Sequence, residues 1–170
     1  MKILKGGYFM RRIIVLGGGY GGILTAKHLA KKLHKSDVKI TLIDKNPYHT
    51  MLTELHEVAC NRVHEDSVKI YFEQVIAGRK IDFTLDEIKH IDFVNQKLSS
   101  EKSEYPYDYL VIGTGCKPTF FGHDEYREHV YTLWSLEDAT ALHEQILEQF
   151  RRAAKTDDEN LRKRMLTFVI

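Results

Sequence analysis

The sequence predicts an α/β fold in which a parallel sheet is accompanied by a small antiparallel β-meander. Three observations support this prediction. An apolar run leads through a glycine turn into a helical pattern over residues 12–30, and a second apolar run follows over 38–43. Residues 80–100 then form short, turn-bounded stretches that alternate apolar and polar side chains. A third apolar run, over 109–112, again ends in glycine.

The first strand and its turn open the pattern. Residues 13–16 are apolar throughout, as in a strand that is buried on both faces. Five of the 11 glycines follow within residues 17–22, and Gly17, Gly19 and Gly22 satisfy the spacing G-x-G-x-x-G. In such a turn the first glycine permits a sharp bend, the second permits close approach of a pyrophosphate, and the third permits tight packing of helix on strand. The unpaired N–H groups at the start of the next helix also favour phosphate.

A helix and a second strand complete this unit. We expect the helix to end at Ser36 and Asp37, and residues 38–43 to form the strand, with Asp44 at its carboxyl end. Asp44 lies 44 − 22 = 22 residues past the last glycine, where an acidic residue accepts hydrogen bonds from a ribose. The combination predicts a dinucleotide site, and the alternative is a turn that serves packing alone. The apolar positions at helical spacing are Ile23, Ala26, Ala30 and Leu33.

Composition excludes several classes of protein. Of the 170 residues, 43% are hydrophobic and 29% are charged, which is typical of a soluble globular domain. The net charge of +1 provides no overall field, so we expect no nucleic-acid partner. The sequence shows neither a signal peptide nor an apolar run long enough to span a bilayer, and we expect a cytoplasmic protein. Residues 1–10 are expected to be a disordered extension ahead of the first strand.

The cysteines and histidines give no metal or disulfide pattern. The spacing of Cys60 and Cys116 fits neither a zinc site nor a C-x-x-C redox pair, so we interpret both as reduced thiols whose side chains are small buried hydrophobes. The nine histidines include no pair with metal spacing and a third ligand. We therefore expect no metal.

A short amphipathic helix is expected after Asn46 and Pro47, which end the second strand. The polar residues His49 and Thr53 lie on or near it, just beyond the carboxyl end of a nucleotide-binding strand, where open α/β sheets bind ligands. We interpret both as candidate cofactor contacts. The alternative is a solvated helix face.

The next segments change periodicity. Residues 68–77 read as a short helix that stops at Gly78. Residues 80–84, 87–94 and 96–100 are expected to be the three strands of the meander, each with one solvated face. A plain nicotinamide dehydrogenase would be expected to continue with alternating strand and helix instead.

The strand over 109–112 is expected to return to the parallel sheet, with Gly113, Thr114 and Gly115 bringing the backbone beside the cofactor. The glycine turn, the terminal acid, the meander and this threonine-glycine turn together resemble the Rossmann-like FAD-binding domain of flavoproteins with two dinucleotide-binding domains. The second motif of that superfamily usually reads alanine-threonine-glycine, and here Gly113 replaces the alanine.

Within that superfamily the sequence most resembles the type II NADH:quinone dehydrogenases. Residues 44–59 look like their sequence after the second strand, and residues 135–139, followed by a long helix, match their pattern. The related disulfide reductases place a C-x-x-x-x-C pair after the second strand, whereas this chain has only Cys60 there, so a dithiol relay is not expected. Sulfide:quinone oxidoreductases remain an alternative.

The last part of the chain suggests a boundary. Ser135 and Asp138 form the pattern of a capping box for a long amphipathic helix, which a charged linker follows up to residue 164. Residues 165–170 read as a buried strand that, in the resembled family, opens the NAD-binding domain. We therefore expect a fold truncated before that domain. The expected segments are an extension over 1–10, an FAD-binding domain over 11–134, a helix and linker over 135–164, and the first strand of a missing domain over 165–170.

The resemblance implies roles for particular residues. The turn would line the pyrophosphate of FAD, Asp44 would bind the adenosine ribose with Lys45 beside it, and His49 and Thr53 would approach the flavin end. Thr114 and Gly115 would close over the cofactor from the second motif, and no side chain here would act as a nucleophile or catalytic acid. The turn comprises Gly17, Gly18, Gly19, Tyr20, Gly21 and Gly22.

For the whole enzyme the resemblance implies that NADH reduces the flavin and that the flavin reduces a quinone at the inner face of the cell membrane. The chain alone would be inactive, and membrane contact would come only through a missing C-terminal part. Alternatives are a sulfide:quinone oxidoreductase or another flavoprotein reductase of the superfamily, and a non-catalytic dinucleotide-binding module. We also expect self-association through apolar surface exposed near residues 168–170 and along the long helix.

Overall fold

The computed structural model describes residues 10–34 and 37–170, and the chain forms two compact units. The first unit comprises the chain up to His49 together with Ile70–Cys116, and the second comprises Thr50–Lys69 and Lys117–Ile170. The expected extension over 1–10 lies outside the described residues except for Met10, and so does Ser36, the first of the two residues expected to end the helix.

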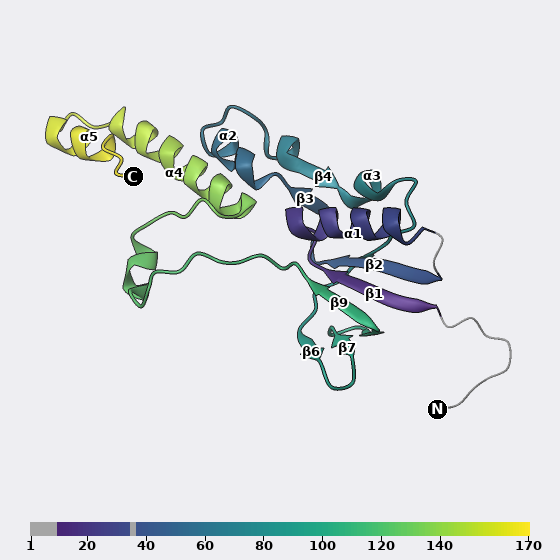
Figure 1. Ribbon diagram of the computed structural model, residues 1–170. Coiled ribbons are helices and arrows are strands. Elements are labelled where there is room, and N and C mark those ends of the chain that lie inside the picture. The colour runs from purple at the N-terminus through teal and green to yellow at the C-terminus, as the bar shows by residue number, and fades with distance from the viewer. Residues whose placement is uncertain (1–9, 35–36) are drawn as a thin grey trace, which may run out of the picture. The chain divides into compact units, whose positions relative to one another are not determined.

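A four-stranded parallel sheet forms the centre of the first unit (Figure 1). Its strand order is β5-β2-β1-β9, so β1 and β2 are the inner strands. The registers place Val15 opposite both Leu42 and Val111, which confirms that the strand over 109–112 returns to the sheet beside the first strand. The strands are β1 (Arg11–Leu16), β2 (Val38–Asp44), β5 (Asp82–Leu85) and β9 (Tyr109–Ile112).

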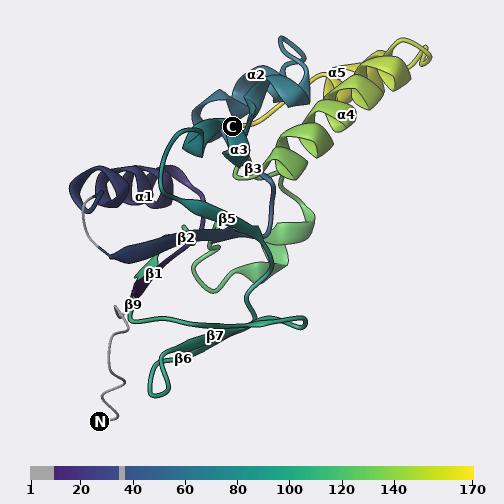
Figure 2. The same ribbon diagram turned by 90° about the vertical axis from the view of Figure 1, so that its right-hand side faces the viewer.

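The two faces of this sheet carry different cores because side chains alternate along each strand. On one face, α1 (Tyr20–Lys32) packs Ala26 and Ala30 against Val15, Leu42 and their neighbours. On the other face, Ile14, Leu16 and Ile43 pack against residues of the antiparallel meander. Figure 2 shows the sheet lying between α1 and the β6–β7 hairpin. The apolar run of β1 is therefore explained by burial on both sides.

The meander is present, but its first strand was assigned wrongly from the sequence. It consists of β6 (His90–Asp92), β7 (Lys97–Ser99) and β8 (Glu104–Pro106), paired antiparallel in that order. The stretch expected to open it is β5, which instead extends the parallel sheet beside β2, and β8 lies outside the three expected stretches. An edge strand of a parallel sheet also exposes part of its side chains, so alternation alone does not separate the two arrangements.

The helix expected over 68–77 is divided. A 3₁₀ helix (Glu65–Val68) precedes β4 (Lys69–Tyr71), and only α3 (Phe72–Ile76) is helical beyond it. β4 pairs with β3 (Tyr48–Thr50) in a two-stranded sheet that the sequence pattern did not predict. Gly78 does follow the helix, with φ of +70°.

The second unit is helical. The short helix expected after Pro47 is a 3₁₀ helix (Leu52–Glu54) followed by α2 (Leu55–Ala59), although Leu52 is exposed rather than buried. Buried Leu55, Val58 and Ala59 pack with residues of α4 (Leu136–Ala153). A further 3₁₀ helix spans Asp124–Glu128. None of the helices in the described part of the chain has the length and apolar character needed to cross a membrane.

The capping box at the start of α4 is confirmed. The backbone N–H of Asp138 donates to Ser135 Oγ at 3.1 Å, and the backbone N–H of Ser135 donates to Asp138 Oδ2 at 3.2 Å. The helix then buries Ala139 and Ala153, whereas Phe150 is half exposed.

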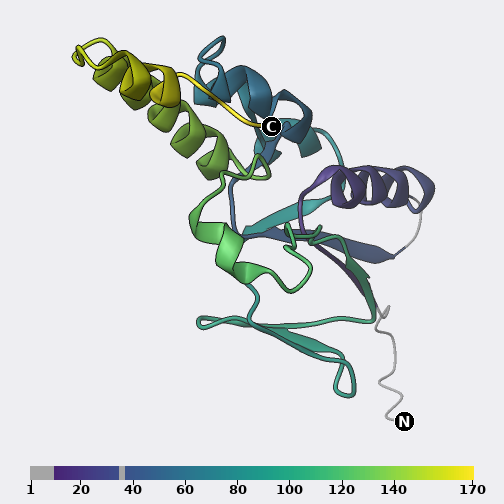
Figure 3. The same ribbon diagram turned by 90° about the vertical axis from the view of Figure 1, so that its left-hand side faces the viewer.

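The end of the chain differs from the expected linker and strand. Residues in the charged stretch form α5 (Glu159–Met165), which begins where Asp158 Oδ1 accepts a hydrogen bond from Leu161 N at 3.0 Å. Residues 166–170 have no regular structure. An isolated strand has no hydrogen-bond partners to hold it, so an apolar run alone does not make one. Figure 3 shows α5 lying beside α4, and Arg162 Nε donates to Ala153 O at 3.3 Å.

An ion pair ties the start of β1 to the residue before β9. Asp108 Oδ2 accepts hydrogen bonds from the backbone N–H of Arg12 at 2.6 Å and from its Nε at 3.3 Å, while Nη2 donates to Oδ1 at 3.3 Å. The hydrogen bond from the Arg12 side chain, followed by the one from its backbone, holds the pKa of Asp108 below its ordinary value of 3.8.

We predict that Asp108→Asn lowers the free energy of unfolding at pH 7 by about 1 kcal/mol, the usual net worth of a partly exposed charged hydrogen bond. Because the folded pKa is depressed, the contribution is present above the unfolded pKa and is lost as the pH falls through the folded value, below 3.8. Urea unfolding at pH 7 and at successively lower pH measures this, with Glu101→Gln as the control for removing an exposed carboxylate. A difference that stayed constant down to the acid limit would contradict the assignment.

Candidate functional site

The turn after β1 is built by close approach of two backbone segments. Gly17 has φ of +98°, and a side chain there would collide with the carbonyl O of Gly113 and with the backbone of Thr114. Gly17 N donates to Ile43 O at 2.8 Å, and Gly113 N donates to Leu16 O at 2.7 Å. The carboxyl ends of β1, β2 and β9 therefore meet at the glycine turn.

Gly22 and Gly19 differ in whether packing leaves room for a side chain. A side chain on Gly22 would overlap the carbonyl O of Gly17, so this glycine is required for the helix to pack on the turn. Gly19 has φ of −69° and ψ of −177°, which any residue adopts. An added Cβ on Gly19 would lie 3.9 Å from Gly113 O, an ordinary contact. The packing of the turn does not require glycine at this position, whereas close approach of a ligand to the backbone would.

The start of α1 suits an anion. Its N-cap residue, Gly19, has no side chain, and in the described structure no side chain caps the helix and no acidic residue lies in its first turn. By contrast, α4 begins with Ser135 and carries Glu137 and Asp138 in its first turn. Helix N-termini leave backbone N–H groups unpaired and carry partial positive charge. The N-terminal end of α1 therefore offers N–H donors to a phosphate group.

Asp44 joins the end of β2 to this turn. Its Oδ2 accepts from Gly18 N at 2.6 Å, and its Oδ1 accepts from Asn46 N at 2.8 Å. A carboxylate oxygen has two acceptor positions, so each oxygen retains one for a ribose hydroxyl. The sequence pattern located this acid but did not reveal that it also fixes the glycine turn.

His49 is buried beside the same turn rather than lying on the surface. It is 6% exposed, and its Nδ1 lies 3.1 Å from Gly18 O. Because a carbonyl oxygen only accepts, Nδ1 carries the proton in this hydrogen bond. The imidazole ring also meets the Tyr20 ring edge to face, with centroids 4.5 Å apart. His49 thus holds the backbone of the turn.

The ring of Phe72 packs against the glycine turn at Gly18. This residue was not identified from the sequence as part of the site. Its side chain is fully buried, and a Cβ added to Gly18 would collide with its ring. Its backbone N–H donates to Pro47 O at 3.1 Å, and its ring packs 4.8 Å from that of Phe83, measured between centroids. The only sequence signal was its place in an apolar pattern, which does not indicate proximity to a distant glycine.

The remaining candidate residues have no described contact with the glycine turn that would fix a role in binding. Lys45 is exposed next to Asp44, and Thr114 and Gly115 are exposed after β9, with φ of +75° at Gly115. Thr53 belongs to the second unit, so its contact with a cofactor stays a prediction. Cys60 and Cys116 are both exposed and neither is in a disulfide, which corrects the expectation that they are buried. The described residues contain no group of three potential metal ligands.

A family of known proteins matches most of this chain. The model of the family described as pyridine nucleotide-disulphide oxidoreductase matches residues 11–161. The chain belongs to this family. The predicted resemblance and the α/β fold class are thereby confirmed at the level of the family.

Two curated proteins with similar sequences are type II NADH:quinone oxidoreductases. The type II NADH:quinone oxidoreductase Ndh of Mycobacterium tuberculosis is 30% identical over 164 residues, which cover 94% of this chain and 35% of the relative. The type II NADH:quinone oxidoreductase of Staphylococcus haemolyticus is 31% identical over 154 residues, covering 89% and 38%. This chain therefore spans little more than a third of the length of these relatives.

Two solved structures share the fold. The sulfide:quinone oxidoreductase of Aquifex aeolicus superposes with a TM-score of 0.70 at 26% identity, covering 83% of this chain and 32% of that one. NDH2 of Plasmodium falciparum in complex with NADH superposes with a TM-score of 0.75 at 18% identity, covering 91% and 32%. The second likeness concerns the fold alone.

We predict that Gly22→Ala destabilises the first unit by about 1–3 kcal/mol, the usual cost of forcing extra atoms into a packed site. Gly21→Ala is the matched control, because a Cβ there meets nothing within 4 Å and alanine is the better helix former. Urea unfolding followed by circular dichroism compares the two variants. Equal stability of the two would show that the turn does not pack as described.

Proposed function

We propose that this chain is the FAD-binding part of a flavoprotein oxidoreductase that passes electrons from NADH through FAD to a quinone. The observation that carries the proposal is the uncapped N-terminus of α1, which opens beside the glycine turn and Asp44. Proteins named type II NADH:quinone oxidoreductase match 88–94% of the chain at 30–31% identity, which supports this choice of cofactor and partners.

The residues present fit a dinucleotide. Within the turn from Gly17 to Gly22, the packing of the fold does not require glycine at Gly19. The start of α1 supplies backbone N–H donors, and no acidic residue in its first turn competes for them. Asp44 retains acceptor positions beside these donors. A group that joins a pyrophosphate to a ribose matches this order of donors and acceptors.

Each residue of the proposed site would bind the dinucleotide or orient the backbone that binds it. The backbone N–H groups at the start of α1 would hold the pyrophosphate, and Asp44 would accept from the adenosine ribose with Lys45 beside it. His49 and Tyr20 would fix the backbone of the turn, while Thr114 and Gly115 would close over the cofactor. When bound, the flavin supplies the two-electron redox chemistry, so this part of the protein needs no nucleophile or catalytic acid.

The proposed substrates concern a protein of the relatives' length. This chain covers 35–38% of the curated relatives, so NADH binding and quinone reduction are proposed for a longer chain, and the segment alone is proposed to be inactive. Contact with the inner face of the cell membrane is proposed for the part of the relatives' length that this chain does not cover. Phe168, Val169 and Ile170 are exposed, and we propose self-association through this apolar surface.

A sulfide:quinone oxidoreductase is the second candidate. The 26% identity to the Aquifex aeolicus enzyme favours it, and Cys60 and Cys116 are exposed thiols. Loss of activity in a longer chain carrying Cys60→Ser or Cys116→Ser would favour this candidate, because electron transfer from NADH does not require a thiol here. A third reading, a non-catalytic dinucleotide-binding module, predicts bound nucleotide without turnover.

We predict that the purified chain shows flavin absorbance bands or takes up added FAD, and that heat releases FAD identifiable by its mass. A colourless protein that bound NAD or ADP but not FAD would contradict the choice of cofactor. A protein that bound none of these would contradict the site itself.

We predict that Gly19→Ala weakens FAD binding by about tenfold or more while leaving the fold intact, because its Cβ would displace the pyrophosphate from charge-assisted hydrogen bonds. Titration with FAD measures the affinity, and circular dichroism checks the fold. Lys102→Ala, in the turn between β7 and β8, is the control for a substitution remote from the turn. Unchanged affinity in Gly19→Ala would count against a dinucleotide at this glycine.

A further inference from the structure

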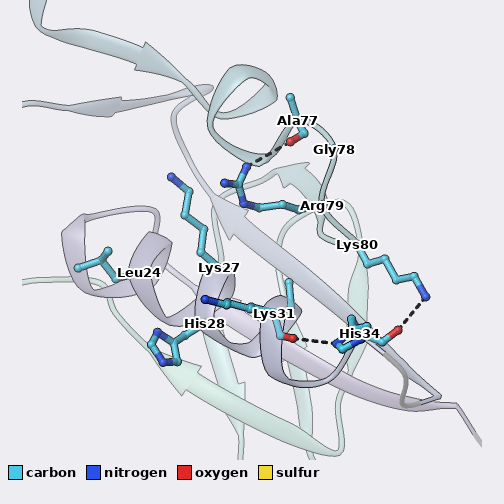
Figure 4. Close-up of a pocket in the computed structure, with 10 residues that line it drawn as sticks. Leu24, Lys27, His28, Lys31, His34, Ala77, Gly78, Arg79 and Lys80 are labelled. Carbon is cyan, nitrogen blue, oxygen red and sulfur yellow. Dashed lines mark hydrogen bonds between the residues drawn. The ribbon is translucent and has the colours of Figure 1, made fainter.

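A basic groove lies in the first unit, between the C-terminal half of α1 and the segment after α3 (Figure 4). Its volume is about 860 Å³. Four of the residues that line it are Lys27 and Lys31 from α1 and Arg79 and Lys80 from the segment after α3. Two histidines, His28 and His34, also line it, and no acidic residue is among the described lining residues. The groove lies toward the end of α1 opposite the glycine turn.

The four cations of this basic groove are not neutralised by the protein. None of them forms an ion pair with a carboxylate among residues 10–34 and 37–170. Figure 4 shows the Lys27 side chain extending from α1 toward Arg79 on the facing segment. Four positive charges that share one open space repel one another, so an anion in the groove would relieve that repulsion.

Neutral carbonyl groups hold the two cations of the facing segment in place. Arg79 Nη1 donates to Val75 O at 3.3 Å and to Ala77 O at 3.2 Å, and Lys80 Nζ donates to His34 O at 3.0 Å. These bonds position the side chains and leave their charge uncompensated. Both Arg79 bonds use Nη1, so Nε and Nη2 have no partner among the described residues and present a fork of donors.

The helix macrodipole accounts for only part of this arrangement. Lys31 lies in the last turn of α1, where a cation is favoured by the partial negative charge of the helix end. Arg79 and Lys80, however, come from a segment more than 45 residues further along the chain. Lys32 shares the last turn with Lys31 but does not line the groove, so helix-end stabilisation alone does not explain the cluster.

We propose that the basic groove binds a phosphate group, carried either by an anionic phospholipid or by a soluble phosphate compound. The free fork of Arg79 matches two oxygens of a phosphate, and the lysines that line the groove add point charges. This site goes beyond the proposed dinucleotide site, since Lys27 and Lys31 lie 8 and 12 residues past the N-cap Gly19, about 12 and 18 Å along the helix.

The test compares two double variants with the same change of charge. Lys31→Gln with Arg79→Gln removes two groove cations, whereas Lys32→Gln with Lys102→Gln removes two exposed cations outside the groove. Calorimetry with inorganic pyrophosphate measures soluble phosphate binding. Sedimentation with vesicles of phosphatidylcholine, with or without phosphatidylglycerol, measures binding to a lipid headgroup. The readout is the difference between the two double variants, because the glycine turn can also bind pyrophosphate.

The expected result is that the groove variant loses affinity by about tenfold or more in one arm, while the control variant stays within about twofold of the original protein. Selective loss in the pyrophosphate arm assigns a soluble phosphate, and selective loss in the vesicle arm assigns a lipid headgroup. Equal affinity of the two double variants, or no binding in either arm, would overturn the proposal. Since Arg79 also contacts the end of α3, Lys27→Gln with Lys31→Gln repeats the test without altering that contact.

Discussion

The first unit depends on the close approach of two backbone turns at Gly17 and Gly113. Neither turn leaves room for a side chain on Gly17, and the hydrogen bond from Gly113 to Leu16 joins the ends of β1 and β9. The hydrogen bond from Gly18 to Asp44 adds the end of β2. Three parallel strands therefore end together at the start of α1. This edge is where open α/β sheets bind ligands, so the packing constraint and the site have one cause.

Sequence patterns predicted the elements whose signals are local. The apolar runs of β1 and β2 and the glycine turn between strand and helix are each contained within a few residues. The parallel place of β5 was missed because pairing with β2 depends on residues about 40 positions away, which periodicity does not report. The strand predicted over residues 165–170 is absent for a related reason. An apolar run becomes a strand only when a neighbouring strand accepts its hydrogen bonds.

In the candidate site, too, the residues with local sequence signals were predictable and the others were not. The glycines and the acid after β2 were predictable because dinucleotide-binding turns place these residue types at fixed spacings. His49 was left between a ligand contact and a surface residue, and its burial against Gly18 was visible only in three dimensions. Phe72 gave no signal, because a ring that fills the space under Gly18 is chosen by shape and comes from a distant part of the chain.

The two ends of α1 show how binding and stability are connected in this unit. Where Ser135 caps α4 with its side chain, α1 has Gly19, which stabilises a helix less by roughly a few tenths of a kcal/mol. At its other end, Lys31 lines the basic groove together with Arg79, and no acidic residue is among the described lining residues. Both features cost stability in the ligand-free protein. A dinucleotide at the first end and a phosphate at the second would each offset that cost, because a ligand that binds only the folded state stabilises it.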